Sequence, residues 1–333
     1  MDPLDLVDFA RALIDIDSTT GREGAAGEWL ADRLRSLGYD VTEQPIGRGC
    51  SNVLATLDAP QAVLSTHFDC VPPFIPSAVR DGRLFGRGSC DAKGILAAQL
   101  AAAERLRAAG ERRVGLLFVA GEERGSDGAL AANQIPNNSR FLVNGEPTDS
   151  RLAEGTRGVL RVKLAAEGRA SHSAAPEHGV SAIDKLLDAL IRLRSLQLPK
   201  DPDLGRTFYS IGLIEGGVAP NVISAHASAE VLFRTVGSAD ELLAIVKMLE
   251  PLVKVREVLR VAPIRMHTVP GFETAVFPFT TDIPFLHRWG TPLLFGPGSI
   301  LEAHTDHEQV PVAELHSAVD RYVELSTALL ATP

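Results

Sequence analysis

Histidines and carboxylates stand directly after short apolar segments of this 333-residue chain. His67 and Asp69 follow the segment AVLST, Glu122 and Glu123 follow LLFVAG, and Glu146 comes two residues after FLVN. Taken singly, each could be a surface residue without a binding role, because acids and histidines are common on protein surfaces. Their shared position at the ends of apolar segments makes binding of a metal ion the alternative interpretation.

Asp91 and His304 extend this set. Asp91 follows the glycine-rich turn GRGSC and precedes a helical segment, where capping the helix would be an equally good use of an aspartate. His304 lies in a loop after an apolar strand. A carboxylate beside an imidazole, as in the HFD spacing of His67 and Asp69, is the arrangement that orients metal-ligating histidines. Imidazole and carboxylate donors without thiolate favour zinc, cobalt or manganese.

The elements that must position these residues form an alternating pattern. Segments 62–67, 113–120 and 141–144 are apolar runs typical of buried strands, and an alanine-rich segment from about residue 94 to 109 is typical of a helix. Strands alternating with helices indicate an α/β fold with a mostly parallel sheet and helices on both faces. Open sheets of this kind bind ligands at the carboxyl ends of their strands, where these acids and histidines stand.

Residues 156–266 follow a different pattern. Alternating strand segments and two helical segments occur there in the order β-α-β-β-α-β, which is the order of a ferredoxin-like α+β domain. We therefore expect a first domain made of residues 1–155 and 267–333, interrupted by an inserted domain of residues 156–266. The inserted domain is near the commonest domain size.

Composition excludes several classes of protein. Apolar residues make up 45% of the chain and charged residues 23%, so a sizeable core is expected. The formal net charge of −9 argues against binding to nucleic acid and to an anionic membrane surface. An acidic amphipathic start and the lack of a long apolar block lead us to expect a cytoplasmic protein. Cys50, Cys70 and Cys90 lack CxxC spacing and are expected to be reduced thiols.

Seven stretches of the chain together resemble a known family. They are LSTHFDCVPP, GRLFGRGSCDAKG, VAGEERGSDGA, NGEPTD, GRASHSAAPEHGVSAI, EGGVAPNVISAHA and FGPGSILEAHTDHE. In this order they resemble the co-catalytic metallopeptidase family that contains acetylornithine deacetylase, succinyl-diaminopimelate desuccinylase, aminoacylase and the glutamate carboxypeptidases. The last stretch is most similar to the acetylornithine deacetylase branch.

The resemblance implies two divalent metal ions, zinc foremost and cobalt or manganese as alternatives. It implies that Asp91 bridges the two ions, that His67 and Glu146 complete one site, and that Glu123 and His304 complete the other.

Further roles follow from the same resemblance. Asp69 would orient His67, and Glu122 would be the general base that accepts a proton from water and passes it to the leaving amine. A cis peptide bond is expected between Asp91 and Ala92, as the family often has one after the bridging aspartate.

The inserted domain corresponds to the family's lid and dimerisation domain, which implies a homodimer. His172 matches the histidine that reaches the partner subunit's active site, where it would hold the oxyanion. Asn221 matches a substrate-contacting asparagine, and Arg234 stands where the family has an arginine for the substrate carboxylate.

Some positions depart from the family pattern. Leu232 replaces the aspartate usually found two residues before the arginine, which weakens the assignment of Arg234. A tryptophan common after the first motif is absent, and the segment leading to Asp91 is short. His307 replaces an acid of the last motif; a supporting or surface role is expected for it, with metal ligation as the alternative.

The expected function is hydrolysis of the amide bond of an N-acyl amino acid, with N-acetylornithine of arginine biosynthesis as the first substrate to consider. A succinyl-diaminopimelate desuccinylase and a dipeptidase or carboxypeptidase are the alternatives within the family. A non-catalytic scaffold that kept the fold is an alternative of another class. A doubly wound nucleotide-binding protein is disfavoured, because no GxGxxG or Walker loop follows the first strands.

Overall fold

The computed structural model describes residues 5–47 and 49–332, and it divides the chain into two compact units. Unit 1 comprises residues 1–154, 266–275 and 281–333, and unit 2 comprises residues 155–265 and 276–280. Unit 2 therefore includes the short segment 276–280, which lies outside the expected inserted domain of residues 156–266.

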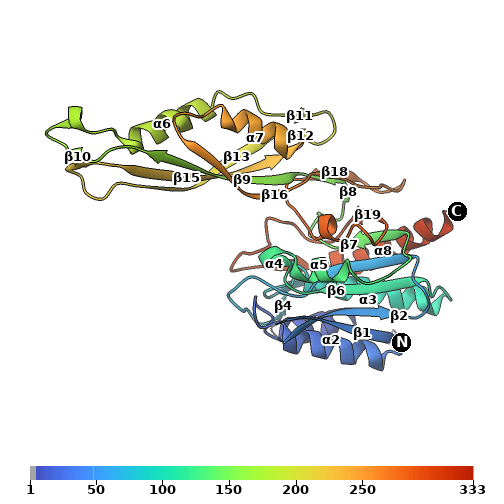
Figure 1. The fold of residues 1–333 in the computed structure, drawn as a ribbon. Helices are drawn as coiled ribbons and strands as arrows, with labels where there is room; N and C mark the ends of the chain where they lie inside the picture. Colours follow the sequence, from blue (N-terminus) through green and yellow to red (C-terminus); the bar gives the residue numbers. More distant parts are fainter. Residues whose placement is uncertain (1–4, 48, 333) are drawn as a thin grey trace. The chain divides into compact units, whose positions relative to one another are not determined.

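Unit 1 is built on a six-stranded sheet with the strand order β1-β2-β6-β3-β7-β19 (Figure 1). The pairs β6–β3, β3–β7 and β7–β19 are parallel, whereas β1–β2 and β2–β6 are antiparallel. The expectation of an α/β fold with a mostly parallel sheet is therefore confirmed. The strands of this sheet are β1 (Asp40–Gly47), β2 (Cys50–Thr56), β3 (Ala62–His67), β6 (Val114–Val119), β7 (Phe141–Asn144) and β19 (Thr291–Leu294).

Helices cover both faces of this sheet. Successive side chains of a buried strand point to opposite faces, so each face carries apolar side chains that pack against helices. Leu64 and Leu116 belong to the core formed with α1, α2, α3 and α8, whereas Val63, Leu117 and Trp289 belong to the core on the side of α5. These helices are α1 (Leu6–Ile14), α2 (Gly24–Ser36), α3 (Lys93–Ala108), α5 (Asp127–Ala132) and α8 (Val312–Ala331).

The remaining elements of unit 1 are short. A three-stranded sheet has the order β20-β5-β4, with β4 at Ala78–Arg80, β5 at Arg83–Phe85 and β20 at Gln309–Pro311. The single turn α4 spans Glu122–Gly125, and the 3-10 turn η2 spans Ile283–Phe285. Strands β8 (Leu152–Thr156), β17 (Ile264–Arg265) and β18 (Thr274–Phe277) lie where the chain passes from one unit to the other.

Unit 2 has a four-stranded antiparallel sheet in the order β13-β15-β9-β16. Helices α6 and α7 lie on one face, so the chain order β9-α6-β13-β15-α7-β16 is that of a ferredoxin-like domain (Figure 1). Ser238 caps the N-terminus of α7, since its hydroxyl accepts a hydrogen bond from the Asp240 amide. The elements of this unit are β9 (Gly158–Glu167), β10 (Ser171–His172), η1 (Pro176–His178), α6 (Ala182–Leu193), β11 (Lys200–Asp201), β12 (Gly205–Arg206), β13 (Phe208–Gly216), β14 (Val222–Ile223), β15 (His226–Thr235), α7 (Ala239–Lys247) and β16 (Lys254–Val261).

Candidate metal centre

The parallel strands of unit 1 bring four of the expected residues to one edge of the sheet. In the register of β3 and β6, His67 lies opposite Val119, after which the chain turns into Glu122 and Glu123 at the start of α4. Strand β7 ends beside β3, and Glu146 follows it by two residues. The carboxyl ends of neighbouring parallel strands therefore converge, as the sequence pattern predicts.

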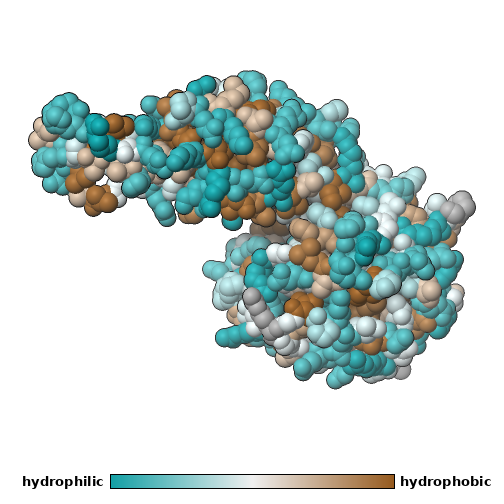
Figure 2. Space-filling model, viewed as in Figure 1, coloured by the Kyte–Doolittle hydropathy of each residue, from teal (hydrophilic) through white to brown (hydrophobic). Residues whose placement is uncertain are grey.

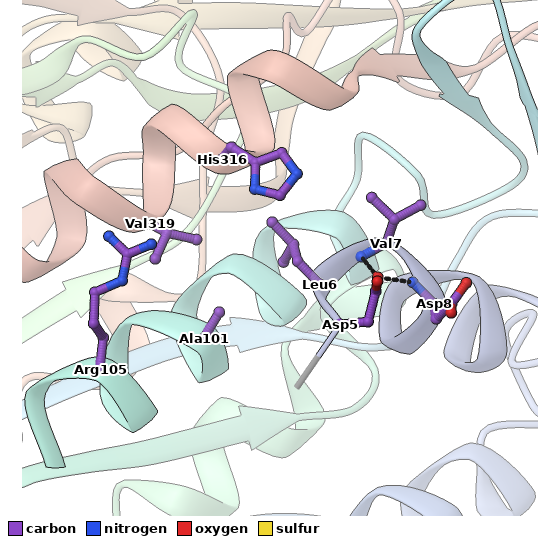
Figure 3. A pocket seen from close by; sticks show the side chains of 8 residues that line it. All are labelled: Asp5, Leu6, Val7, Asp8, Ala101, Arg105, His316 and Val319. Atoms are coloured by element: carbon purple, nitrogen blue, oxygen red, sulfur yellow. Dashed lines mark hydrogen bonds between the residues drawn. The ribbon is translucent and has the colours of Figure 1, made fainter. Parts of the chain in front are cut away.

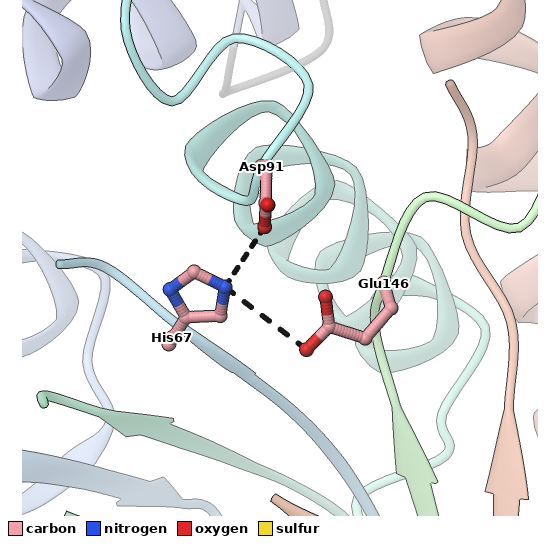
Figure 4. A group of neighbouring side chains, drawn as sticks. All are labelled: His67, Asp91 and Glu146. Carbon is pink, nitrogen blue, oxygen red and sulfur yellow. Dashed lines mark hydrogen bonds and ion pairs between the residues drawn. The ribbon is translucent and has the colours of Figure 1, made fainter. Parts of the chain in front are cut away.

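The first candidate group consists of His67, Asp91 and Glu146 (Figure 4). The Nε2 atom of His67 lies 3.0 Å from Oδ1 of Asp91 and 4.0 Å from Oε1 of Glu146. All three side chains are buried. Within the described part of the chain, Oε1 of Glu146 has no hydrogen-bond partner. A buried carboxylate oxygen without a donor is costly unless a cation or a water completes it.

The second candidate group consists of Asp91, Glu123 and His304. The Nε2 atom of His304 lies 2.9 Å from Oε1 of Glu123 and 3.2 Å from Oδ2 of Asp91. His304 has a φ of +64°, a left-handed conformation that is uncommon for residues other than glycine. Asp91 therefore belongs to both groups, and each of its two oxygens faces a different histidine.

The local backbone explains how Asp91 can serve both groups. The cap position of α3 is Ala92, and no side chain caps that helix end. The Asp91 side chain thus does not fill the capping role that was the alternative to metal binding. The peptide bond between Asp91 and Ala92 is cis, as the family resemblance predicts.

Asp69 has contacts beyond those expected. Its carboxylate accepts hydrogen bonds from the backbone amides of Glu122 and Glu123, at 3.2 and 3.1 Å. The Nδ1 atom of His67 is closer to the backbone oxygen of Asp69 (3.0 Å) than to the carboxylate (3.5 Å). Asp69 therefore fixes the turn that carries Glu122 and Glu123, and it orients His67 mainly through its main-chain carbonyl.

The two groups fit divalent metal ions. In each group three donor atoms, all imidazole nitrogen or carboxylate oxygen, lie within 4.8 Å of one another. Such donors suit zinc, cobalt and manganese, and the unpartnered oxygen of Glu146 has the free lone pairs that a cation requires. His307 is in neither group and is exposed, whereas His304 is the histidine that faces the carboxylates.

Binding of metal to the metal-free protein is expected to release protons. Hydrogen bonds to Asp91 and Glu123 raise the pKa of His304 to about 10, and the pKa of His67 also lies well above its usual value. With a pKa of about 10 the His304 ring is protonated near pH 7.5, and it must lose its proton to become a ligand. Calorimetric titration with Zn²⁺ in buffers of different ionisation enthalpy should show at least one proton released per chain and affinity that increases with pH. Metal uptake without proton release at pH 7.5 would contradict these ligands.

Glu122 lies beside the two groups without belonging to either. Its side chain is partly exposed, yet burial of the carboxyl and the nearby Asp282 carboxylate raise its pKa well above the usual value. A raised pKa favours proton transfer near neutral pH, which suits a general base.

Asp282 is a residue of this region that the sequence analysis did not identify. It is 1% exposed, and among the described residues neither of its carboxylate oxygens has a hydrogen-bond partner. Burial raises its pKa to about 6, and its charge contributes to the raised pKa values of Glu122 and Glu146. No family motif or apolar run in the sequence singles out this aspartate, so only the tertiary structure places it near Glu122.

Replacement of Asp282 by asparagine should change the pH dependence of the reaction. The Asp282 charge disfavours ionised Glu122, so the variant should lower the pKa of Glu122 and move the acidic limb of the kcat/KM profile to lower pH, by up to about one unit. The profile should be measured with metal content matched to the parent. An unchanged limb, or a shift to higher pH, would show that Asp282 does not act on the Glu122 carboxyl.

The remaining expected residues lie in unit 2. Strands β10 and β14 pair His172 with Val222, and the Asn221 backbone oxygen accepts a hydrogen bond from the Ser173 amide. His172 and Asn221 are therefore neighbours, and both are exposed. The Nδ1 atom of His172 accepts a hydrogen bond from the Ala174 amide, so the neutral ring carries its proton on Nε2 and can donate it.

Arg234 lies on β15, opposite Phe208 of β13. Its guanidinium is half-buried, and burial lowers its pKa. Among the described residues it has no hydrogen-bond or ion-pair partner. A half-buried cation without a partner is suited to an anionic group of a ligand.

Other features of unit 1 lie apart from the candidate metal ligands. A surface cavity of about 320 Å³ lies between α1, α3 and α8, and its lining includes Arg105 and His316 (Figure 3). None of the candidate metal ligands lines this cavity. Cys50, Cys70 and Cys90 are free and buried, and burial raises the pKa of all three thiols. Within the described residues, no helix has the length and apolar character needed to cross a membrane.

An α/β unit with two histidine–carboxylate groups that share one aspartate defines the chain as a candidate two-metal enzyme. Residues 63–328 match Peptidase family M20/M25/M40. A probable carboxypeptidase from Aspergillus clavatus is 36% identical over 98% of this chain and 82% of its own length. A peptidase M20 domain-containing protein from Schizosaccharomyces pombe is 36% identical over 95% of this chain and 83% of its own length.

Solved structures share the fold. A tripeptidase from Staphylococcus aureus superposes with a TM-score of 0.83 at 20% identity, covering 98% of both chains. A dinuclear metal-binding peptidase from Bacillus subtilis superposes with a TM-score of 0.74 at 15% identity, again covering 98% of both chains. The chain belongs to peptidase family M20/M25/M40 and is a metal-dependent hydrolase of amide bonds.

Proposed function

We propose that this protein hydrolyses an amide bond whose amine half is an amino acid with a free carboxylate, using two divalent metal ions. The observation that carries the proposal is the position of Asp91, whose two oxygens face His67 and His304 respectively. One carboxylate shared by two ligand groups is suited to hold two ions close together.

In this proposal His67, Asp91 and Glu146 hold one ion, and Asp91, Glu123 and His304 hold the other. When bound, the ions would lower the pKa of water and polarise the substrate carbonyl. Glu122 accepts a proton from the attacking water and returns it to the leaving amine. Asp69 holds the amides of Glu122 and Glu123, which keeps the base beside the ligands.

Arg234 is proposed to bind the free carboxylate of the substrate. Replacing it with alanine should raise KM for substrates with a free carboxylate by roughly 10- to 100-fold, because a charge-assisted hydrogen bond contributes about 1.5–3 kcal/mol. Substrates amidated at that carboxylate should react poorly with the parent, and the substitution should not slow them further. Arg256→Ala, which removes an exposed arginine of β16 in the same sheet, is the control. Equal losses for both substrate types would contradict this role.

The relatives refine the choice of acyl group. Carboxypeptidase and acyl-amino-acid deacylase activities cleave the same kind of bond and differ only in what lies on the carbonyl side. The fungal relatives are named probable carboxypeptidases, and a carboxypeptidase has a peptide on the carbonyl side of the bond it cleaves. The last sequence motif instead resembles the acetylornithine deacetylase branch, in which an acetyl group occupies that side. We therefore propose a carboxypeptidase or dipeptidase first, with N-acetylornithine-type deacetylation as the second candidate.

A substrate panel tests this order. Parent enzyme should be assayed with Zn²⁺, Co²⁺ or Mn²⁺ on dipeptides, N-blocked dipeptides, N-acetylornithine and N-succinyl-diaminopimelate. Release of the carboxyl-terminal residue from a peptide at least tenfold faster than deacylation, by kcat/KM, supports the first candidate. The reverse ratio supports the second, and no cleavage of any member contradicts the proposed function.

A homodimer is part of the proposal, because one copy of unit 2 cannot place both His172 and Arg234 on one small substrate. Arg234 lies near one end of β15, eight residues from His226, which is roughly 27 Å along a strand. Strand β10, which carries His172, lies beyond the His226 end (Figure 1). If both residues contact the same substrate, one of them comes from a second copy of the chain.

Unit 2 offers a surface for that second copy. Strand β13 is an edge strand of its sheet and exposes Leu213 and Ile214. Helix α6 exposes Ile183, Leu187 and Ile191, which stand four residues apart on one face. Figure 2 shows apolar side chains at the surface of this unit among hydrophilic ones. An unpaired strand edge with apolar neighbours favours pairing with an identical edge.

A further inference from the structure

The loop that delivers Asp91 is held by one buried carboxylate. Oε1 of Glu308 accepts hydrogen bonds from the backbone amides of Gly88, Cys90 and Asp91, at 2.9, 3.0 and 3.0 Å. Glu308 is 1% exposed, so these bonds form away from water. Three amides that converge on one oxygen fix the path of the backbone immediately before the proposed bridging carboxylate.

The other oxygen of Glu308 connects this loop to His304. Oε2 lies 2.6 Å from Nη1 of Arg87, which is also buried. The same nitrogen donates a hydrogen bond of 3.1 Å to the backbone oxygen of Thr305. Arg87 therefore holds Thr305, the residue directly after His304. The left-handed backbone of His304 costs of order 1–3 kcal/mol and needs support from the surrounding structure.

We propose that Glu308 and Arg87 form a positioning clamp that sets the geometry of Asp91 and His304 together, and so controls the occupancy of the metal group formed by Asp91, Glu123 and His304. Neither residue touches substrate or metal in this account. The inference rests on the proposed two-metal centre. It adds the two residues that allow the group of Asp91, Glu123 and His304 to bind its ion.

The clamp should affect the two groups unequally. His67 ends β3 and Glu146 follows β7, so both are held by the central sheet as well as by their own contacts. His304 lies in an irregular loop, and its group depends on the clamp through both Asp91 and Thr305. Loss of the clamp should therefore weaken the His304 group more than the His67 group.

Glu308→Gln tests the clamp with little change of shape. The amide nitrogen of the glutamine must face either the three backbone amides or Arg87. Both are hydrogen-bond donors, so in either orientation two donors face each other and one side of the clamp loses its hydrogen bonds. Metal-stripped parent and variant should be titrated with Co²⁺, followed by the visible absorption of the bound ion and by calorimetry. The parent should bind two equivalents, and the variant should bind the second roughly 10- to 100-fold more weakly, as for other residues that support metal ligands. The Co²⁺ absorption of the second equivalent should also change.

Glu104→Gln is the matched control. Glu104 is a buried carboxylate of unit 1 that accepts a hydrogen bond from Tyr39 and pairs with Arg107. Thermal unfolding of the metal-free proteins should show that both variants lose stability, while only Glu308→Gln changes the second Co²⁺ equivalent. If Glu308→Gln does not fold, Arg87→Lys replaces it. Lysine keeps the buried charge, but a single ammonium on a shorter side chain cannot hold Glu308, Thr305 and the backbone oxygen of Pro73 together, as Nη1 and Nε of Arg87 do.

The outcomes separate the clamp from the metal centre. Weakened second-metal binding in Glu308→Gln or Arg87→Lys, with normal binding in Glu104→Gln, supports the clamp. Two equivalents bound with parental affinity and an unchanged Co²⁺ spectrum in the clamp variant overturn it while leaving the proposed function intact. A parent protein that binds fewer than two equivalents contradicts the proposed two-metal centre itself, and with it the clamp.

Discussion

Glu122→Gln is expected to lower kcat by about 10²- to 10⁴-fold, the usual contribution of a positioned general base. Glutamine keeps the size of the side chain and cannot accept the proton of the attacking water. The amides of residues 122 and 123 still reach Asp69, so the turn that carries Glu123 should keep its geometry. Metal content, measured by elemental analysis, should equal that of the parent.

Asp127→Asn provides the control for this variant. Asp127 is an exposed carboxylate of the same segment and pairs with Arg124 at 3.2 Å. Its replacement should leave kcat within about twofold, since an exposed ion pair contributes little. Near-parental turnover of a metal-replete Glu122→Gln preparation would rule out Glu122 as the base.

His172→Ala is expected to lose roughly 10²- to 10³-fold in kcat, the cost of removing one donor to a developing oxyanion. The ring is exposed, and its Nδ1 accepts from the Ala174 amide, which leaves the Nε2 proton available to a substrate oxygen. Steady-state kinetics of the metal-replete variant measure this loss.

Co-expression of His172→Ala with Glu122→Gln shows which subunit supplies the histidine. If His172 acts across a dimer, a mixed dimer has one site with an intact Glu122 and an intact histidine from the neighbour. Random assembly of equal amounts then gives about a quarter of the parental activity in a two-fold symmetric dimer. If His172 acts within its own chain, every site lacks one of the two residues and the mixture stays inactive.

The sequence could predict the residues whose positions depend on strand ends. His67 and Glu146 follow apolar runs, and parallel pairing of such runs brings their carboxyl ends together without further information. The same reasoning predicted the α/β fold of unit 1 and the ferredoxin-like order of unit 2. His304 was chosen over its neighbour His307 through the family resemblance, and the loop geometry now shows that His304 is the one that faces Asp91 and Glu123.

Residues that support the site from a distance could not be predicted in this way. Asp282 belongs to no periodic segment and comes near Glu122 only through tertiary packing. The clamp joins Arg87 and Glu308, which are 221 residues apart in the chain. Asp69 was expected to orient His67 through its carboxylate. That carboxylate lies 3.5 Å from Nδ1 of His67, and it also accepts hydrogen bonds from the two backbone amides of Glu122 and Glu123, which the sequence did not indicate. Local sequence patterns contain no signal for such long-range contacts.

The most direct test of the two-metal mechanism is a titration of metal-stripped protein with divalent ion while cleavage of a peptide with a free carboxyl terminus is followed. The protein should have no activity without metal, gain activity until about two ions are bound per chain, and lose it completely on addition of a chelator. Full activity in protein shown by elemental analysis to contain no metal would contradict the two-metal mechanism, as would saturation of ion binding at one per chain.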